Sequence, residues 1–250
     1  MGEFAIGQAV PRTEDPRLLR GRGRFIDDVQ LLEPAHAMVL RSPHAHALIV
    51  SINVTTACAM PGVLAVLTGA DYRDDGLGGM PCQITTFERP DGSPMFSPIH
   101  PALAMDRVHR VGDNVALVVA ETKEQAKDAA EQIVVEYAPL PSVSNTAEAL
   151  LPEVPAVWDD CPDNICFQLS VGDRSAVEAA MANASHIVRR RFVVNRVSAN
   201  TMEPRGCIGH YDEHEDRYTL YVGLQNPHEV RRQLASGIFN LPETSFRIVP

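Results

Sequence analysis

Residues 111–141 read VGDNVALVVAETKEQAKDAAEQIVVEYAPLP, and their pattern indicates secondary structure more clearly than any other part of the chain. The run NVALVVA at 114–120 is short, apolar and rich in valine, which predicts a strand. Thr122, followed three residues later by Gln125, has the spacing of a capping box and predicts the start of a helix. The run IVVEY at 133–137 predicts a second strand, which the prolines of APLP end. The stretch therefore predicts a strand–helix–strand unit.

The predicted helix carries a single apolar face. Its apolar residues recur at helical intervals along one side: Ala126, Ala129, Ala130, Ile133 and Val134. Such a stripe is stable when it is buried on a sheet, so this unit predicts a domain of the α+β class.

Other elements are predicted on both sides of this unit. Upstream, strand-like runs lie at 37–42, 47–54 and 62–69, and residues 71–101, rich in Gly, Pro, Asp and Ser, predict a loop with a short strand at 83–87. Downstream, the pattern predicts helices at 173–188 and 226–243 and strands at 189–197, 206–212, 216–225 and 245–250. The buried stripe of the last helix is predicted as Val230, Leu234 and Ile238.

The composition limits the class of function. The chain has 250 residues, of which 45% are hydrophobic and 22% are charged, as in an ordinary globular protein. Its formal net charge of −10 argues against nucleic acid as the main partner, and no apolar run is long enough to span a membrane. The N-terminus lacks the pattern of a secretory signal, so we expect a soluble, cytoplasmic protein. The arginines of RLLRGRGRF at 17–25 are typical of a solvated loop.

No spacing of histidines or cysteines predicts a clear metal site. His44 and His46 would face the same side of a strand without a carboxylate or cysteine in register, and we expect hydrogen bonds in a turn instead. The five cysteines are irregularly spaced and are expected to be reduced thiols: Cys58, Cys82, Cys161, Cys166 and Cys207. A hydrolase that uses Cys58 or Cys207 with a histidine is one alternative from the residues alone.

Two polar side chains are candidate site residues, each with two open interpretations. Glu203, which Pro204 holds in an extended backbone, either satisfies nearby backbone groups or points into a cavity. Asn226 predicts the N-cap of the following helix, and Pro227 suits its first position. Gln225 lies one residue before that cap, and its amide either caps the helix or donates a hydrogen bond to a ligand.

The chain also carries longer blocks in a fixed order. They are IGQAVPRTEDPRLLRGRGRFIDDV (6–29), VLRSPHAHALIVSINVTTACAMPGVLAVLTGADY (39–72), the stretch at 109–141, VGDRSAVEAAMANASHIVRRRF (171–192), TMEPRGCIGHYD (201–212) and GLQNPHEVRRQLASGIFNLPE (223–243). Together these blocks resemble the N-terminal part of the large subunit of the xanthine dehydrogenase, aldehyde oxidase and carbon monoxide dehydrogenase family of molybdenum hydroxylases.

The resemblance implies a domain order. It places an N-terminal arm at 1–18, an a/b hammerhead domain at 19–141, a linker at 142–165 and an incomplete, truncated first section of the molybdopterin-binding domain at 166–250. The family's GGGFG motif and its catalytic glutamate are expected beyond Pro250. We therefore expect no catalytic residue in this chain and no activity from this chain alone.

The resemblance also implies a cofactor. The complete enzyme is expected to hydroxylate an aldehyde, an aromatic heterocycle, a purine or carbon monoxide with water as the oxygen source, using molybdenum in molybdopterin cytosine dinucleotide. Gln225 corresponds to the glutamine of the family's QN corner, which donates a hydrogen bond to the oxo ligand of the molybdenum. Glu203 and Asn226 are expected to support this site without contacting the metal.

The expected partners also follow from the resemblance. They are an iron–sulfur small subunit, an FAD-binding medium subunit and the remainder of the large subunit, in a homo-oligomer of the complete complex with a small-molecule substrate. The alternative is a non-catalytic module that assembles electron-transfer subunits.

Overall fold

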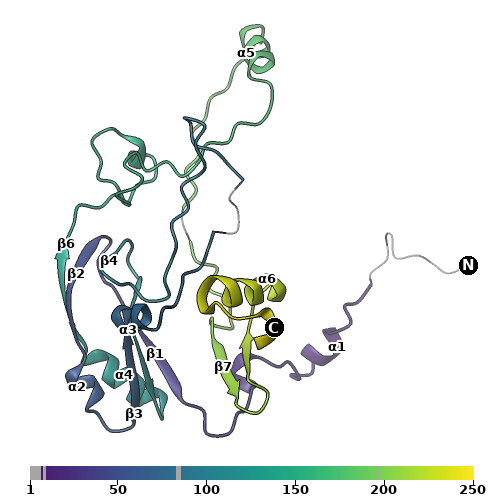
Figure 1. Ribbon diagram of the computed structural model, residues 1–250. Helices are drawn as coiled ribbons and strands as arrows, with labels where there is room; N and C mark the ends of the chain where they lie inside the picture. Colours follow the sequence, from purple (N-terminus) through teal and green to yellow (C-terminus); the bar gives the residue numbers. More distant parts are fainter. Residues whose placement is uncertain (1–6, 8–9, 83–85, 196) are drawn as a thin grey trace, which may run out of the picture. The chain divides into compact units, whose positions relative to one another are not determined.

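The computed structural model describes residues 7, 10–82, 86–195 and 197–250 (Figure 1). They form two compact units, each built from separate parts of the chain. The larger unit comprises residues 34–198 and 232–242, and the smaller unit comprises 199–231, 243–250 and the described part of 1–33. The domain boundaries predicted from the sequence stay a prediction. No helix among the described residues is long and apolar enough to cross a membrane.

Two antiparallel three-stranded sheets form the frame of the larger unit. The first contains β1 (His36–Arg41), β5 (Asn114–Ala120) and β3 (Val63–Thr68), in the order β1-β5-β3. The second contains β4 (Arg107–Val108), β2 (Ala47–Asn53) and β6 (Val134–Pro139), in the order β4-β2-β6. The strands predicted from the sequence in this region are therefore confirmed.

Helix α4 (Lys123–Glu131) packs on the sheet of β1, β5 and β3, as its apolar stripe predicts. The Oγ1 atom of Thr122 accepts a hydrogen bond from the backbone N–H of Gln125 at 3.2 Å, which confirms the predicted cap. Val134 departs from the predicted stripe and is 66% exposed, because it begins β6 rather than ending the helix. A second correction is that β5 and β6 belong to different sheets.

The core lies on both faces of β5, because alternate side chains of a strand point to opposite sides. On one face, Ala116, Val118 and Ala120 pack with the buried alanines of α4 and with Ala57 of α2 (Thr55–Cys58). On the other face, Val115 packs with Ala47 and Val108 of the second sheet. These side chains are small, so helix and strands approach closely.

The region predicted as a loop at 71–101 begins with a helix that the sequence analysis missed. Helix α3 (Gly69–Asp74) starts after Thr68, whose N–H and hydroxyl both donate to the Asp71 carboxylate at 2.7 Å. These hydrogen bonds hold the pKa of Asp71 below its usual value. The short strand predicted at 83–87 falls largely outside the described residues.

The chain beyond α3 also approaches another backbone within the larger unit. The N–H of Gly78 donates to the carbonyl of Ile238 at 2.8 Å. A Cβ atom on Gly78 would lie only 2.0 Å from the carbonyl oxygen of Gly237, so this contact requires glycine at position 78.

The third sheet lies in the smaller unit and has the order β7-β8-β9. It contains β7 (Cys207–Asp212), β8 (Arg217–Val222) and β9 (Phe246–Val249), with β7 antiparallel and β9 parallel to β8. The three strands predicted downstream of residue 205 are therefore confirmed. The shorter helical elements of this unit are α1 (Asp15–Leu18), η1 (Ile26–Asp28) and η4 (Glu243–Ser245).

The last predicted helix forms, but it changes type along its length. Helix α6 (Pro227–Arg232) continues as a π-helical segment, η3 (Gln233–Phe239), and the segment ends at Asn240 with a left-handed φ of 51°. Val230, Leu234 and Ile238, the predicted buried stripe, are only partly buried. Gln233 and Ala235 are more deeply buried, because π turns rotate the side chains relative to an α-helical pattern.

Two predictions between residues 173 and 197 need correction. Helix α5 (Arg174–Ala182) is capped by Asp173 as a helix should be, but it is shorter than the predicted 173–188. Residues 189–195 and 197 form no strand. Their sequence favours extended backbone, but within the described residues no neighbouring strand completes a ladder with them.

Candidate functional site

The parallel pair β8 and β9 defines one edge of the smaller unit. Tyr221 lies opposite Val249 in this pair, so both strands end at the same edge of the sheet. The carboxyl ends of parallel strands are a common place for ligands in proteins with helices and sheets. Gln225 and Asn226 follow directly after β8 at this edge, and we therefore take it as the candidate functional site.

The two amides at this edge have different roles in the structure. The Oδ1 atom of Asn226 accepts a hydrogen bond from the N–H of Glu229 at 3.3 Å, which confirms the predicted helix cap. Gln225 is exposed, and its side chain has no hydrogen-bond partner among the described residues. Because Asn226 already caps the helix, the amide of Gln225 is available to a ligand.

Glu203 satisfies a backbone group of the N-terminal segment at 10–33, which belongs to the smaller unit and is called the arm from here on. Its Oε1 atom accepts a hydrogen bond from the N–H of Ile26 at 3.1 Å, and Ile26 lies close to Gly206. The hydroxyl of Thr201 donates to the backbone carbonyl of Glu203 at 2.7 Å. The sequence left two interpretations of Glu203 open. For Oε1, the structure supports the interpretation in which the carboxylate satisfies a nearby backbone group.

Glu203 also borders a cavity of about 290 Å³. Its lining includes Arg17, Arg24 and Ile26 from the arm and Tyr221, Gly223 and Val249 from the edge of the sheet. Arg17 and Arg24 were not singled out by the sequence analysis, which assigned their run to a solvated loop. No spacing in the sequence singles them out, because Glu14 and Asp27 lie three residues from Arg17 and Arg24 respectively.

The structure brings Glu203 to this cavity but does not bring Gln225 into it. Within the described residues, Gln225 does not line the cavity and makes no hydrogen bond to Glu203 or Asn226. The three residues named from the sequence therefore lie in one unit and near one sheet edge, without forming a contiguous cluster.

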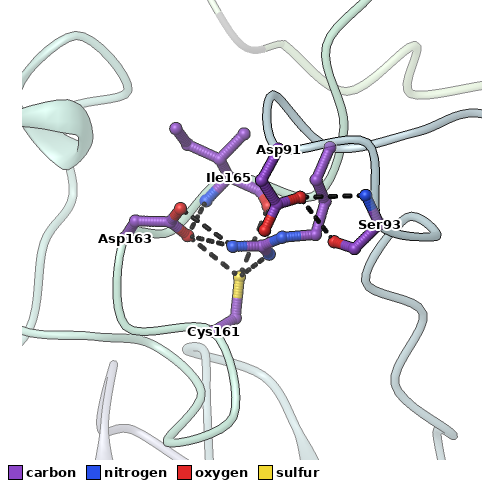
Figure 2. Close-up of polar contacts among 6 residues, drawn as sticks. Asp91, Ser93, Cys161, Asp163 and Ile165 are labelled. Atoms are coloured by element: carbon purple, nitrogen blue, oxygen red, sulfur yellow. Dashed lines mark hydrogen bonds and ion pairs between the residues drawn. The ribbon is translucent and has the colours of Figure 1, made fainter.

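A second polar cluster lies in the larger unit around Arg89 (Figure 2). The guanidinium of Arg89 donates to both oxygens of Asp163 at 2.8 and 2.9 Å, to the carbonyl of Ile165 at 2.7 Å and to Sγ of Cys161 at 3.2 Å. The N–H of Ile165 and the guanidinium together hold the pKa of Asp163 below its usual value. This cluster fixes the region predicted as a linker against the loop after α3.

A stack of aromatic rings lies close by in the same unit. The ring of His109 stacks on Trp158 with centroids 3.8 Å apart, and it lies 5.8 Å from the ring of His46. Burial, and then the charge of His46, lower the pKa of His109. His46 contacts the carbonyl of Pro141 through Nδ1 at 2.9 Å. Of the two histidines predicted to hydrogen-bond in a turn, His44 and His46, the ring of His46 does contact a carbonyl, but this carbonyl lies 95 residues away rather than in the same turn.

The remaining chemical candidates do not form a catalytic group. Among the residues that the structure describes, no three His, Cys, Asp or Glu side chains are placed to hold a metal ion. Cys58 and Cys207 are exposed and, within the described part of the chain, hydrogen-bond to no histidine. Burial raises the pKa of the Cys166 thiol, which disfavours the reactive thiolate.

Comparisons with known proteins match both parts of the chain. The family model for the a/b hammerhead domain of aldehyde oxidase and xanthine dehydrogenase matches residues 20–141. The model for the molybdopterin cofactor-binding domain matches residues 157–250.

Relatives along nearly the whole chain are large subunits of enzymes. The nicotine 6-hydroxylase large subunit of Paenarthrobacter nicotinovorans is 39% identical over 92% of this chain and 27% of its own length. The carbon monoxide dehydrogenase large chain of Hydrogenophaga pseudoflava is 32% identical over 99% of this chain and 31% of its own length.

A solved structure agrees with these relatives. The structure of quinoline 2-oxidoreductase from Pseudomonas putida 86 matches with a TM-score of 0.85 and 37% identity, over 100% of this chain and 30% of that chain. The chain thus spans about 30% of the length of such relatives. Its fold is a hammerhead domain followed by the start of a molybdopterin-binding domain, as the sequence predicts. The chain belongs to the xanthine dehydrogenase, aldehyde oxidase and carbon monoxide dehydrogenase family, and it corresponds to the N-terminal part of the family's molybdopterin-binding large subunit.

Proposed function

We propose that this chain is part of the large subunit of a molybdenum hydroxylase, which oxidises its substrate with water as the oxygen source. The observation that carries the proposal is the succession of two family models, hammerhead and molybdopterin-binding, along 20–141 and 157–250. Electrons would pass to iron–sulfur clusters and FAD on partner subunits. The complete complex would be a cytoplasmic homo-oligomer.

The substrate belongs to the group of aldehydes, aromatic heterocycles, purines and carbon monoxide. The relatives named for nicotine and quinoline are 39% and 37% identical to this chain, whereas the carbon monoxide dehydrogenase chain is 32% identical. Nicotine and quinoline are both nitrogen heterocycles. These identities favour a nitrogen heterocycle within that group.

The residues at the carboxyl edge fit a cofactor that is held through hydrogen bonds. The side chain of Gln225 is exposed, has no partner among the described residues and offers N–H donors. The molybdopterin cofactor, as cytosine dinucleotide with molybdenum, supplies the redox chemistry when it is bound. Gln225 would donate a hydrogen bond to its oxo ligand and so favour negative charge there.

The neighbouring residues would position this amide. Asn226 fixes the start of α6 by capping it, and the backbone of Gln225 is therefore held at the turn between β8 and that helix. Glu203 would act at a distance, by anchoring the N-terminal arm through Ile26. Neither residue would touch the metal.

Several large apolar side chains of this chain are exposed. In the segment predicted as a strand, Phe192, Val193 and Val194 are 85%, 77% and 89% exposed. Consecutive large apolar residues are seldom left in water over such a length. We infer that this segment packs on the remainder of the large subunit, so the chain alone would be inactive.

The test compares this chain with the complete large subunit expressed beside its partner subunits. We expect molybdenum, pterin and turnover of a heterocycle in the complete subunit, and none of these in the 250-residue chain. Stoichiometric metal with turnover in the short chain would contradict the proposal. The alternative, a non-catalytic assembly module, predicts co-purification with electron-transfer subunits while the complete subunit carries no metal.

A further inference from the structure

Two arginines of the N-terminal arm face the cavity at the carboxyl edge of the smaller unit's sheet. Arg17 and Arg24 both line this cavity of about 290 Å³. Neither has a hydrogen bond from its side chain or an ion pair within the described residues. We propose that Arg17 and Arg24 bind the phosphate group of an organic phosphate ester in this cavity.

Arg17 and Arg24 have no carboxylate partner among the described residues, a property that they share with Arg20, Arg22 and Arg205. Elsewhere in the described chain, arginines commonly contact a carboxylate: Arg12, Arg73, Arg89, Arg107, Arg110, Arg174, Arg217 and Arg231. In a chain with a net charge of −10, acids are available for pairing. Two unpaired guanidinium groups on one cavity therefore leave a local positive charge that an anion can neutralise.

The carboxylate of Glu203 is the opposing charge in the same lining. One of its oxygens already accepts the N–H of Ile26, so the carboxylate is held by the arm rather than by an arginine. Counting the lining side chains gives two cations, Arg17 and Arg24, against one anion. The lining side chains thus carry a net positive charge, and the α-carboxylate of Pro250, which also borders the cavity, is a second negative group in the 250-residue chain.

The shape and lining indicate the class of anion. A guanidinium donates through a planar fork that matches the oxygens of a phosphate, and two such groups fit a doubly charged phosphate better than a single carboxylate. Phe25, Ile26 and Val249 supply apolar surface to the same cavity. A volume of about 290 Å³ exceeds what a bare phosphate fills, so an organic group attached to the phosphate would contact this surface.

Two sources share this chemistry. One is the phosphate ester of the pterin cofactor, and this assignment rests on the proposed function. The other is a free metabolite that carries a phosphate ester. The proposal of phosphate binding rests on the cavity and its two arginines, whether the phosphate belongs to the cofactor or to a free metabolite.

The test titrates the 250-residue chain with phenyl phosphate and with inorganic phosphate by calorimetry. We expect saturable binding, tighter for phenyl phosphate, and weaker binding as salt is raised because exposed charges are screened. Arg17→Gln and Arg24→Gln should each weaken binding about fivefold. Arg20→Gln changes a residue of the same arm that does not line the cavity, and it should leave binding unchanged.

A further variant tests the sign of the charge. Glu203→Gln keeps an oxygen for the Ile26 N–H but removes the negative charge, so it should tighten binding roughly threefold. Absence of saturable binding, equal losses in Arg17→Gln, Arg24→Gln and Arg20→Gln, or weaker binding by Glu203→Gln would overturn the proposal. These titrations involve no molybdenum, so their failure is distinct from failure of the proposed function.

The source is identified in the complete subunit by measuring the fluorescence of released pterin. A loss of pterin in the double variant Arg17→Gln/Arg24→Gln, with pterin retained in Arg20→Gln, assigns the phosphate to the cofactor. Unchanged pterin, together with phenyl phosphate binding by the wild-type chain, assigns the cavity to a free phosphate ester.

Discussion

Glu203 accepts a hydrogen bond at 3.1 Å from the backbone N–H of Ile26, a residue 177 positions earlier in the chain. This contact ties the N-terminal arm to the sheet edge that carries Gln225. The segments before residue 34 and after residue 198 thus meet at one carboxylate, which explains a glutamate at this position without a catalytic role.

Replacement of Glu203 should release the arm. Glu203→Leu leaves the Ile26 N–H without its acceptor, which costs about 1 kcal/mol of local stability. We expect trypsin to cleave after Arg22 and Arg24 several times faster than in the wild-type chain. Glu203→Gln, which retains an acceptor oxygen, should be cleaved at the wild-type rate, and equal rates for all three proteins would refute this role.

Substitution of Gly78 should destabilise the larger unit. A methyl group there would meet the carbonyl oxygen of Gly237 at 2.0 Å, so Gly78→Ala must push two backbones apart. Overpacking of this kind lowers the free energy of unfolding by about 2 kcal/mol, which chemical denaturation measures. Gly209→Ala is the control, because a Cβ atom at Gly209 meets nothing within 4 Å. A Gly78→Ala protein as stable as Gly209→Ala would mean that this close approach is absent.

The Arg89 cluster should weaken in acid. The pKa of Asp163 lies below its usual value of 3.8, first because the Ile165 N–H donates to it and also because of Arg89. A lowered pKa in the folded state contributes stability that is present above pH 3.8 and is lost as the pH falls through the folded value. The protection factors for hydrogen exchange in residues 158–168, which correct for the slower intrinsic exchange in acid, should therefore fall at acidic pH.

Variants separate this effect from general acid unfolding. Arg89→Met should accelerate exchange in residues 158–168 already at neutral pH, because it removes the donors to Asp163 and Ile165 (Figure 2). Arg73→Met breaks a pair whose side chains are 51% and 80% exposed, and it should have little effect. If exchange in 158–168 is the same in both variants, the cluster does not hold this segment.

The phenol of Tyr211 should lose its proton at a higher pH than an ordinary tyrosine does. Its hydroxyl donates to Asp216 at 2.7 Å, and this hydrogen bond raises the pKa of Tyr211 to about 12. A raised phenol pKa contributes stability below pH 10, and this contribution is lost as the pH rises through about 12. Ultraviolet titration of the phenolates should show that Asp216→Asn moves Tyr211 toward its ordinary value, while the pKa of Tyr137, which burial raises, stays where it is. Glu213→Gln removes only the smallest cause of the raised pKa and should move Tyr211 much less, and a Tyr211 pKa that is unchanged in Asp216→Asn would contradict the assignment.

The strand–helix–strand stretch shows what local pattern can predict. The spacing of Thr122 and the alanine stripe determine α4 because the same residues that favour a helix also form its buried face. The pattern could not show that β5 and β6 join different sheets, because sheet partners are set by contacts far along the chain. It also overpredicted a strand at 189–197, since extended backbone needs a neighbouring strand to form a ladder.

The candidate site was harder to predict from the sequence than the strand–helix–strand stretch. Residue chemistry predicted Asn226 as the helix cap and left Gln225 open, and only the family resemblance gave that amide a ligand. The partner of Glu203 could not be found from spacing, because Ile26 is 177 residues away. Arg17 and Arg24 emerged only when the structure placed them on one cavity.

We propose that this chain presents Gln225 to the molybdenum cofactor of the complete subunit. The most direct test is the electron paramagnetic resonance spectrum of reduced molybdenum in the complete enzyme, compared for wild type, Gln225→Ala and Gln132→Ala. Gln132 is an exposed glutamine in the larger unit and serves as the control. We predict altered g values for Gln225→Ala and a wild-type spectrum for Gln132→Ala, at equal molybdenum content. An unchanged spectrum in Gln225→Ala would contradict the account.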